Sequence, residues 1–273
     1  MRRSWLFVPG ADPQAHEAAA ASGADVIILE LEDFTPPELR PKGRELSRHV
    51  FDRWRKAGAV AAARINPLET CGNDDLIGVL AGRPDLILMS KVVTPQQVAA
   101  LEKATGGAME LVPNVETAAG LMNAFAIARA SPRVSALLVA SEDMVADLGT
   151  ARSRRGEELA YVRSRFLVEC RAAGVEAIDC PYTFSDVKGA IADAKTAKRL
   201  GYRMKSLVDP AHARAINAVF SPTKAEIRKA ERIVTAFEKA RAAGRERAKV
   251  DGALIEVPIY AAAKRLLESL ARS

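Results

Sequence analysis

The chain has 273 residues, of which 49% are hydrophobic and 27% are charged, so it can bury a substantial core. This length is compatible with one large α/β barrel or with two smaller domains. The net charge of +6 favours an anionic small-molecule ligand. It argues only weakly for nucleic acid, because no dense basic run is present and aromatic residues make up only 5%. We therefore expect a small-molecule substrate and no nucleic-acid partner.

The cysteines and the apolar segments indicate the cellular compartment in which the protein works. Three cysteines without a C-x-x-C pair predict neither a disulfide framework nor a zinc site. The apolar run at residues 5–8 is too short for a signal peptide, and no apolar stretch approaches the ~20 residues of a membrane span. These features favour a reducing, cytoplasmic setting without a membrane partner.

Short apolar runs with the length of strands recur eight times, mostly separated by helical segments. Continuous apolar runs are typical of parallel strands that helices cover. The alternation predicts an α/β fold, a (β/α)8 TIM barrel, over residues 1–220. A doubly wound open sheet is the alternative, although no G-x-G-x-x-G follows any strand. The expected strands are residues 4–8, 25–31, 60–65, 86–89, 109–112, 136–140, 176–180 and 204–208. The expected helices are residues 11–23, 38–57, 73–81, 117–130, 159–173 and 187–200, with another beginning near 94 and a loop or turn at 144–149.

Residues 221–273 extend beyond the predicted barrel. Ser221 as N-cap and Pro222 in the first turn predict a helix that runs to about Ala243. A strand-like run and a final amphipathic helix follow within residues 252–272. We expect this C-terminal extension to pack on a neighbouring subunit, which makes the chain a homo-oligomer.

Two predicted strands end at carboxylates, Glu116 and Asp143. The C-terminal ends of parallel strands are where α/β folds place their sites. Two carboxylates on neighbouring strand ends can share a hard cation, and Mg²⁺ is typically held by one or two carboxylates with water and substrate oxygens. The alternative is that both are ordinary loop acids or helix N-caps.

Arg64 ends another buried strand and can serve enolate chemistry. A metal ion chelates the oxygens of a 2-oxo acid, and a permanently charged guanidinium stabilises the developing oxyanion. The alternative is a surface or inter-strand ion pair, which is less common for an arginine that follows Val-Ala-Ala-Ala on a buried strand.

Glu32, Asp33 and Lys91 also follow predicted strands. The two acids can bind substrate or accept hydrogen bonds from metal-bound water, or they can form a capping turn before Pro36. Lys91 can form a Schiff base, although pairing with an acid such as Glu116 is the more ordinary role for a lysine.

Several motifs in series resemble the citrate lyase β-subunit-like proteins of the HpcH/HpaI aldolase and citrate lyase superfamily, which also contains malyl-CoA and citramalyl-CoA lyases. The resemblance covers nearly the whole chain in the right order. The motifs are RSWLFVPG at 3–10, LELED at 29–33, RIN at 64–66, PNVE at 113–116, SEDMVADLG at 141–149, FSPTKAE at 220–226 and DGALIEVP at 251–258.

The resemblance implies a barrel that forms trimers or hexamers and lends its C-terminal segment to a neighbour. It implies Mg²⁺ on Glu116 and Asp143, and Arg64 at the substrate carbonyl. It also implies reversible Claisen-type cleavage of a 3-hydroxy-acyl-CoA to acetyl-CoA and an oxo acid. The acid/base of these lyases lies in the motif that matches residues 251–258 and acts in the adjacent subunit, so here it is Glu256.

The chain departs from the family pattern at three places. Glu256 replaces the usual aspartate before the final Val-Pro and is one methylene longer. Asp209 replaces the histidine of the Gly-Lys-x-x-Ile-His-Pro motif, and Phe34-Thr35 replaces the common Ala-Val after Glu32-Asp33. The last change should reshape the rim of the pocket.

The sequence thus predicts a Mg²⁺-dependent lyase acting on a 3-hydroxy-acyl-CoA or a related 3-hydroxy acid. Glu116 and Asp143 bind the metal, Arg64 stabilises the enolate oxygen, and Glu256 carries the proton. One alternative is a class I aldolase that uses Lys91 or Lys205 as a Schiff base. The other is a non-catalytic subunit that binds an acyl-CoA or a carboxylate.

Overall fold

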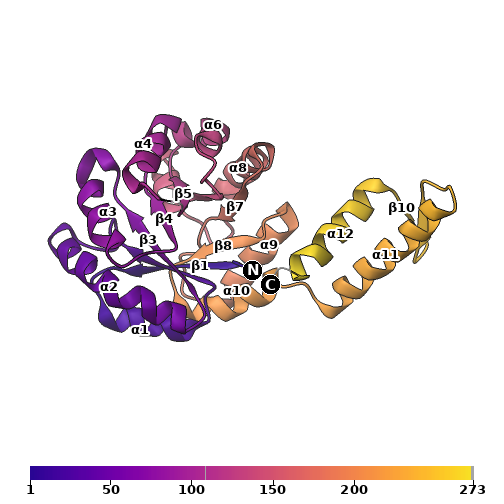
Figure 1. The fold of residues 1–273 in the computed structure, drawn as a ribbon, viewed down its shortest axis with the longest axis horizontal. Helices are drawn as coiled ribbons and strands as arrows, with labels where there is room; N and C mark the ends of the chain where they lie inside the picture. Colours follow the sequence, from indigo (N-terminus) through magenta and orange to yellow (C-terminus); the bar gives the residue numbers. More distant parts are fainter. Residues whose placement is uncertain (108, 272–273) are drawn as a thin grey trace. The chain divides into compact units, whose positions relative to one another are not determined.

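A computed structural model describes residues 1–107 and 109–271 and contains a closed barrel of eight parallel strands, which confirms the (β/α)8 prediction (Figure 1). Each strand pairs with its neighbour in sequence, and β1 pairs with β8 to close the barrel. The strands are β1 Ser4–Pro9, β2 Val26–Glu30, β3 Val60–Ile65, β4 Leu86–Met89, β5 Glu110–Val115, β6 Ala136–Val139, β7 Glu176–Asp179 and β8 Met204–Leu207.

Helices follow the strands and cover the outside of the barrel (Figure 1). Gly23 and Gly174 end two of them in the left-handed conformation that favours glycine. The helices of this part of the chain are α1 Pro13–Ser22, α2 Arg40–Lys56, α3 Asn73–Leu80, α4 Pro95–Thr105, α5 Ala118–Met122, α6 Ala124–Arg129, α7 Glu142–Asp147, α8 Ala160–Ala173, α9 Val187–Leu200 and α10 Ala213–Phe220, with short helical turns η1 Pro37–Leu39, η2 Leu68–Gly72, η3 Glu157–Leu159 and η4 Pro210–His212.

Three local predictions were wrong. Residues 144–149 were expected as a loop, but α7 occupies most of them. The expected helix at 117–130 is interrupted at Asn123, which separates α5 from α6. The helix that was predicted to begin at Ser221 is capped by Thr223 instead, because Thr223 and Glu226 form a reciprocal capping box.

The inside of the barrel is apolar from the N-terminal ends to the middle of the strands and polar at their C-terminal ends. Side chains alternate between the interior and the surrounding helices, so residues two apart on a strand share a face. Glu30, Arg64, Ser90 and Asn114 each lie two residues beyond a member of the apolar interior cluster. That cluster comprises Trp5, Phe7, Val26, Ile28, Ala62, Leu86, Leu88, Val112, Ala136, Leu138 and Ile178.

A separate charged group is buried between β7, β8 and the helices α8 and α9. Lys205 donates to Asp179 at 2.6 Å and pairs with Asp193. Arg163 donates to both oxygens of Asp179 at 2.7 and 2.8 Å and to Asp193 at 2.9 Å. Burial alone would lower the pKa of Lys205, but the attraction of Asp179 and Asp193 outweighs burial and raises this pKa above its ordinary value. The amine therefore stays charged. Because Lys205 contacts groups on the helices, it is not the Schiff-base lysine of the aldolase alternative.

Replacing Asp179 with asparagine should destabilise the barrel strongly. Two buried cations would keep one shared carboxylate, and breaking a buried pair typically costs about 3–5 kcal/mol. Both tryptophans, Trp5 and Trp54, are buried in this part of the chain, so their fluorescence during urea unfolding measures the effect. Asp52→Asn, which removes an exposed partner of Arg55, is the matched control and should leave the urea midpoint essentially unchanged. An unchanged midpoint in Asp179→Asn would show that the network is dispensable.

The chain divides into two compact units, the barrel at Arg2–Phe220 and a unit that begins at Ser221 and includes Met1. In the second unit, α11 Lys224–Ala242 and α12 Val257–Ala271 pack together, and β9 Ala248–Val250 pairs antiparallel with β10 Ala253–Ile255. Phe237 and Tyr260 stack in its core at 4.6 Å.

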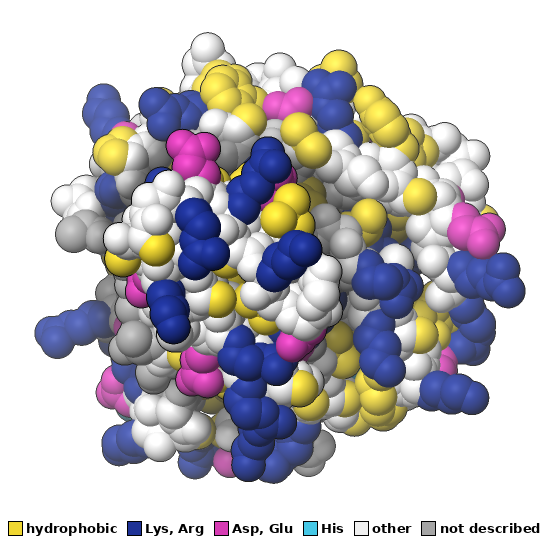
Figure 2. Space-filling view, turned by 90° about the vertical axis from the view of Figure 1, so that its right-hand side faces the viewer, with side chains coloured by type: hydrophobic (Ala, Val, Ile, Leu, Met, Phe, Trp, Pro, Cys, Tyr) yellow, Lys and Arg dark blue, Asp and Glu magenta, His cyan; other side chains and the backbone are white. Residues whose placement is uncertain are grey.

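The C-terminal segment carries most of the chain's net positive charge. Residues 221–273 contain twelve Lys and Arg against seven Asp and Glu. In the space-filling view, Lys and Arg side chains outnumber the acidic ones on the visible face (Figure 2). Among the described residues, no helix combines the length and apolar character needed to cross a membrane.

Candidate active site

Arg64 is the centre of the polar layer at the C-terminal end of the barrel. It lies opposite Glu30 in the register of β2 and β3, so the inter-strand ion pair considered from the sequence is present inside the barrel. Its Nε and Nη2 atoms donate to Glu30 Oε1 at 3.1 and 2.9 Å. Nη2 also lies 3.1 Å from Glu32 Oε2, and Nη1 donates to Glu116 Oε1 at 3.4 Å. Three carboxylates from three strand ends therefore hold one buried guanidinium.

Two aromatic rings complete the surroundings of Arg64. The guanidinium carbon lies 4.8 Å from the ring centroid of Phe7 and 5.9 Å from that of Phe34. Burial lowers the pKa of Arg64, but the attraction of Glu30, Glu116 and Glu32 outweighs it and raises the pKa above the ordinary value. The guanidinium is therefore a fixed positive charge.

Glu116 follows β5 and is fully buried, with only one of its two carboxylate oxygens in a hydrogen bond among the described residues. Burial raises the pKa of its carboxyl to about 8, and the nearby Glu32 and Asp143 add to the increase while Arg64 opposes it. Within the described part of the chain, Glu116 Oε2 has no hydrogen-bond partner. It is not a helix cap either, because Thr117 caps α5.

Asp143 lies half-buried in the first turn of α7, close enough to Glu116 and Lys91 to influence the pKa of both. Across residues 1–107 and 109–271, no cluster of three or more His, Cys, Asp or Glu forms a ready-made metal cage. The donor set of Glu116 and Asp143 thus suits a cation that takes only two protein carboxylates and fills its shell with water and substrate oxygens.

Glu32 and Lys91 form an ion pair across the ends of β2 and β4. Glu32 is 4% exposed, and Lys91 also lies 3.6 Å from Asp33. The hydrogen bond to Glu32 raises the pKa of Lys91 to about 12 despite partial burial, so the amine is protonated. A protonated amine is not a nucleophile, which argues against Lys91 as a Schiff-base residue. The expected pairing of Lys91 with an acid is confirmed, although its partners are Glu32 and Asp33 and not the suggested Glu116.

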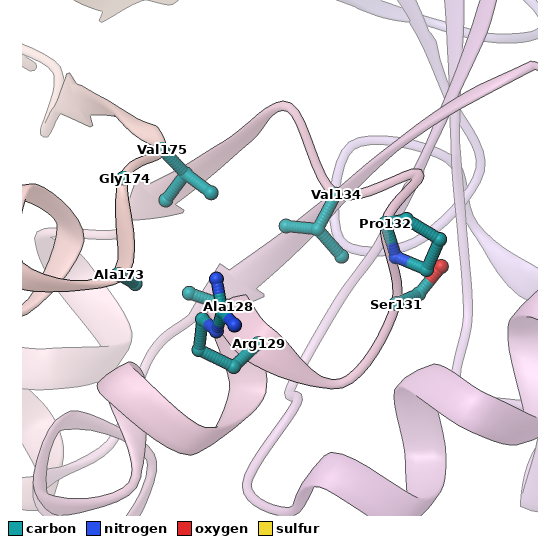
Figure 3. Close-up of a pocket in the computed structure, with 8 residues that line it drawn as sticks. All are labelled: Ala128, Arg129, Ser131, Pro132, Val134, Ala173, Gly174 and Val175. Carbon is teal, nitrogen blue, oxygen red and sulfur yellow. The ribbon is translucent and has the colours of Figure 1, made fainter.

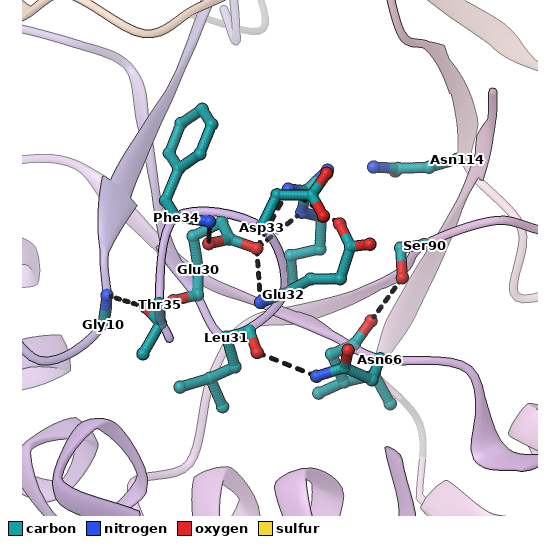
Figure 4. A network of polar contacts seen from close by, with 12 residues as sticks. Gly10, Glu30, Leu31, Glu32, Asp33, Phe34, Thr35, Asn66, Ser90 and Asn114 are labelled. Atoms are coloured by element: carbon teal, nitrogen blue, oxygen red, sulfur yellow. Dashed lines mark hydrogen bonds and ion pairs between the residues drawn. The ribbon is translucent and has the colours of Figure 1, made fainter. Parts of the chain in front are cut away.

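The capping alternative for Glu32 and Asp33 was also wrong. The turn η1 that follows them has Pro36 at its N-cap position and no side-chain cap. Figure 4 shows instead that Glu30 holds this loop, because its carboxylate accepts the backbone N–H groups of Glu32 and Phe34.

Glu256 lies in the C-terminal unit, directly before α12. Its side chain is half exposed, and its Oε1 lies 3.3 Å from Arg247 Nε. Both residues line a cavity of 380 Å³ together with Arg241 and Pro258. The role of Glu256 as proton carrier remains a prediction.

Sequence reasoning missed three buried polar residues of the site. Glu30 accepts hydrogen bonds from Arg64 and from the backbone of residues 32 and 34. The sequence could have indicated Glu30, because it lies two residues before Glu32 and so shares its face of an extended chain. Asn114 donates to Glu116 Oε1 at 3.4 Å. Among the described residues, Asn114 Oδ1 and Ser141 Oγ have no hydrogen-bond partner. Like Glu116 Oε2, these two atoms lie at the C-terminal ends of β5 and β6, and buried unsatisfied polar atoms of this kind are typical of a polar ligand site.

A further cavity of 360 Å³ lies at the opposite end of the barrel (Figure 3). The residues that line it precede β6 and β7 in the sequence, and they are Ala128, Arg129, Ser131, Pro132, Val134, Ala173, Gly174 and Val175. The N-terminal face of such barrels serves stability, whereas catalytic groups lie at the C-terminal face. The cluster around Arg64 is therefore the candidate active site.

Comparison with known proteins places this barrel in a family. The family model described as HpcH/HpaI aldolase/citrate lyase matches residues 3–210. The chain belongs to the HpcH/HpaI aldolase/citrate lyase family. The match spans every residue of the barrel site, from Phe7 to Asp143, and confirms the resemblance seen in the motifs.

Individual members of the HpcH/HpaI family resemble the chain over nearly its full length. Citrate lyase subunit beta of Leuconostoc mesenteroides is 30% identical, over 98% of this chain and 93% of that protein. A (3S)-malyl-CoA thioesterase of Cereibacter sphaeroides is 33% identical, over 93% and 89%. The structure of CitE from Mycobacterium tuberculosis in complex with magnesium, acetoacetate and coenzyme A superimposes with a TM-score of 0.80, 26% identity and 97% coverage of both chains.

Proposed function

We propose that this protein is a Mg²⁺-dependent carbon–carbon lyase that cleaves a 3-hydroxy-acyl-CoA, such as a malyl- or citramalyl-CoA, or a related 3-hydroxy acid. The products are an acetyl unit and an oxo acid. The observation that carries this proposal is the charge around Glu116. Five carboxylates surround two cations there, and the buried Glu116 Oε2 has no hydrogen-bond partner among the described residues.

Glu116 and Asp143 are the residues that would hold Mg²⁺, and the donor chemistry fits. Uncompensated carboxylates are costly to bury close together, and a divalent cation removes that cost. Glu32 and Asp33 lie next to this pair and can accept hydrogen bonds from water or substrate on the ion. The CitE structure with magnesium, acetoacetate and coenzyme A supports both the ion and a ligand that carries coenzyme A.

The reaction breaks the bond between C2 and C3 of the substrate. The C3 hydroxyl loses its proton and becomes the carbonyl of the oxo acid, while the electron pair remains on C2 as the enolate of the acetyl thioester. When bound, Mg²⁺ supplies positive charge that polarises the carbonyl oxygen. Arg64 has a permanent charge and fixed N–H directions, so it stabilises the developing oxyanion without reorganising.

A proton must finally reach C2, and we propose Glu256 of a neighbouring subunit for this transfer. Its carboxylate lies in the C-terminal unit, so an exchange of residues 221–273 between copies of the chain would complete the site. This arrangement makes the active protein a homo-oligomer, a trimer or a hexamer.

The test is product analysis on malyl-, citramalyl- and 3-hydroxy-3-methylglutaryl-CoA, each with Mg²⁺ and with excess EDTA. We expect acetyl-CoA and an oxo acid in equal amounts from the accepted substrate, and no products with EDTA. The malyl-CoA thioesterase relative makes hydrolysis the second candidate. Free thiol and an intact hydroxy acid would favour hydrolysis over cleavage.

Two other outcomes would overturn the proposal. Turnover that EDTA does not affect, with borohydride trapping of an oxo acid, would favour a Schiff-base aldolase. Calorimetric binding of the thioester without any product would favour a non-catalytic binding subunit.

A further inference from the structure

Phe34 is a large apolar side chain that remains 39% exposed at the edge of a buried ionic site. Its ring meets Phe7 edge-on, with 6.3 Å between the centroids and 74° between the planes. The same ring lies 5.9 Å from the guanidinium carbon of Arg64. Figure 4 shows the ring rising from the loop, away from the carboxylate of Glu30. An exposed aromatic ring in this place is available to a ligand.

The loop fixes the position of this ring. The backbone N–H of Phe34 donates to Glu30 Oε2 at 2.7 Å. The next residue, Thr35, is buried, and its hydroxyl donates to the carbonyl of Glu30 at 2.6 Å and accepts from the N–H of Gly10 at 2.8 Å. The backbone that carries the ring is therefore attached to two strand ends by buried hydrogen bonds, and the edge-on contact with Phe7 holds the ring itself.

The distance to Arg64 determines which part of a substrate the ring would meet. An oxygen on the guanidinium sits about 3 Å from its nitrogens, and carbon atoms pack at about 3.5–4 Å. A group attached to a carbonyl carbon on Arg64 therefore comes within contact of a ring 5.9 Å away. The nucleotide end of a long thioester lies much farther from the reacting carbons.

We propose that Phe34 is a specificity-determining residue that limits the oxo-acid product to a carbonyl carbon carrying hydrogen or a methyl group. This inference rests on the proposed function, because it assumes that the guanidinium of Arg64 contacts the carbonyl of the oxo acid as well as the enolate oxygen of the acetyl unit. Larger alkyl groups on the carbonyl carbon of the oxo acid would clash with the ring, which its contact with Phe7 and the hydrogen-bonded loop hold in place. Discrimination of one methylene in an apolar contact is typically about 10–200-fold.

The test is calorimetric binding of glyoxylate, pyruvate, 2-oxobutyrate and 2-oxo-3-methylbutanoate to the full chain with Mg²⁺. The wild-type protein should bind glyoxylate or pyruvate at least about tenfold more tightly than the larger acids. In Phe34→Ala this ratio should shrink at least about tenfold, and Phe34→Leu should lie between. Phe125→Ala, which removes an exposed ring from α6, is the control and should keep the wild-type ratio.

Each other outcome has a distinct meaning. An unchanged size preference in both Phe34 variants, with binding retained, would overturn the role of Phe34 alone. Weaker binding of coenzyme A by Phe34→Ala at an unchanged oxo-acid preference would place the ring against the nucleotide and also overturn it. If no oxo acid binds the wild-type protein with Mg²⁺, the proposed function fails, and the inference fails with it.

Discussion

Replacement of Glu116 with glutamine should abolish Mg²⁺-dependent turnover and, at the same time, stabilise the metal-free protein. Glutamine keeps the size of the side chain and an oxygen that can accept from Arg64, but it loses the charge that a cation needs. Loss of groups that only support metal ligands already costs about 10–100-fold in affinity or activity. A direct ligand should therefore cost more than about a hundredfold in Mg²⁺ affinity.

The stabilising effect follows from the pKa of Glu116. Burial raises this pKa from an ordinary 4.5 to about 8 in the folded protein. Between these values the unfolded chain has released the proton and the folded chain still holds it, so stability falls as the pH rises. An elevation of even one pKa unit corresponds to about 1.4 kcal/mol. Glutamine does not titrate, so the variant escapes this loss.

Urea unfolding without metal, followed by tryptophan fluorescence at pH 5.5 and pH 8.5, measures this difference. The variant should gain on the wild-type protein as the pH rises and stay ahead above pH 8. Glu157→Gln removes a mostly exposed carboxylate and should show no such pH-dependent gain. A Glu116→Gln protein that unfolds earlier than wild type at pH 8.5 would show that the charge of Glu116 stabilises the free site.

The strand ends of the barrel explain how much of the site the sequence could predict. A charged side chain at the end of a continuous apolar run is visible without a structure, and Glu116, Asp143 and Arg64 were selected in this way. All three lie in or beside one cluster. The direction of a side chain is a different matter. In a strand buried on both faces, apolar residues occupy both parities, so the pattern does not show which face is the interior.

Lys205 and Arg64 illustrate this gap, since each is a basic residue on a buried strand. Arg64 shares the parity of the interior cluster and points into the site, whereas Lys205 pairs with Asp193 on α9. The suggested partner of Lys91 was also wrong, because Glu32 follows β2, which lies two strands away from β4 around the barrel. Such pairings depend on how the barrel closes, which no local spacing encodes.

Changing Arg64 to lysine should lower kcat by about 10²–10³, the usual cost of removing one donor to an oxyanion. The substitution keeps the positive charge, so a large effect would show that geometry is required as well. The guanidinium contacts Glu30 through Nε and Nη2, Glu32 through the same Nη2, and Glu116 through Nη1. One ammonium on a flexible stem cannot meet three carboxylates from three strand ends.

Steady-state kinetics on the accepted thioester, with KM determined separately, measures this effect. The loss should fall mainly on kcat, because the developing oxyanion forms only after binding. Arg40→Lys is the matched control, since Arg40 donates to the backbone carbonyls of Glu32 and Thr35 in the same loop. If Arg64→Lys keeps wild-type kcat while Arg40→Lys does not, the loop and not the guanidinium is what the reaction requires.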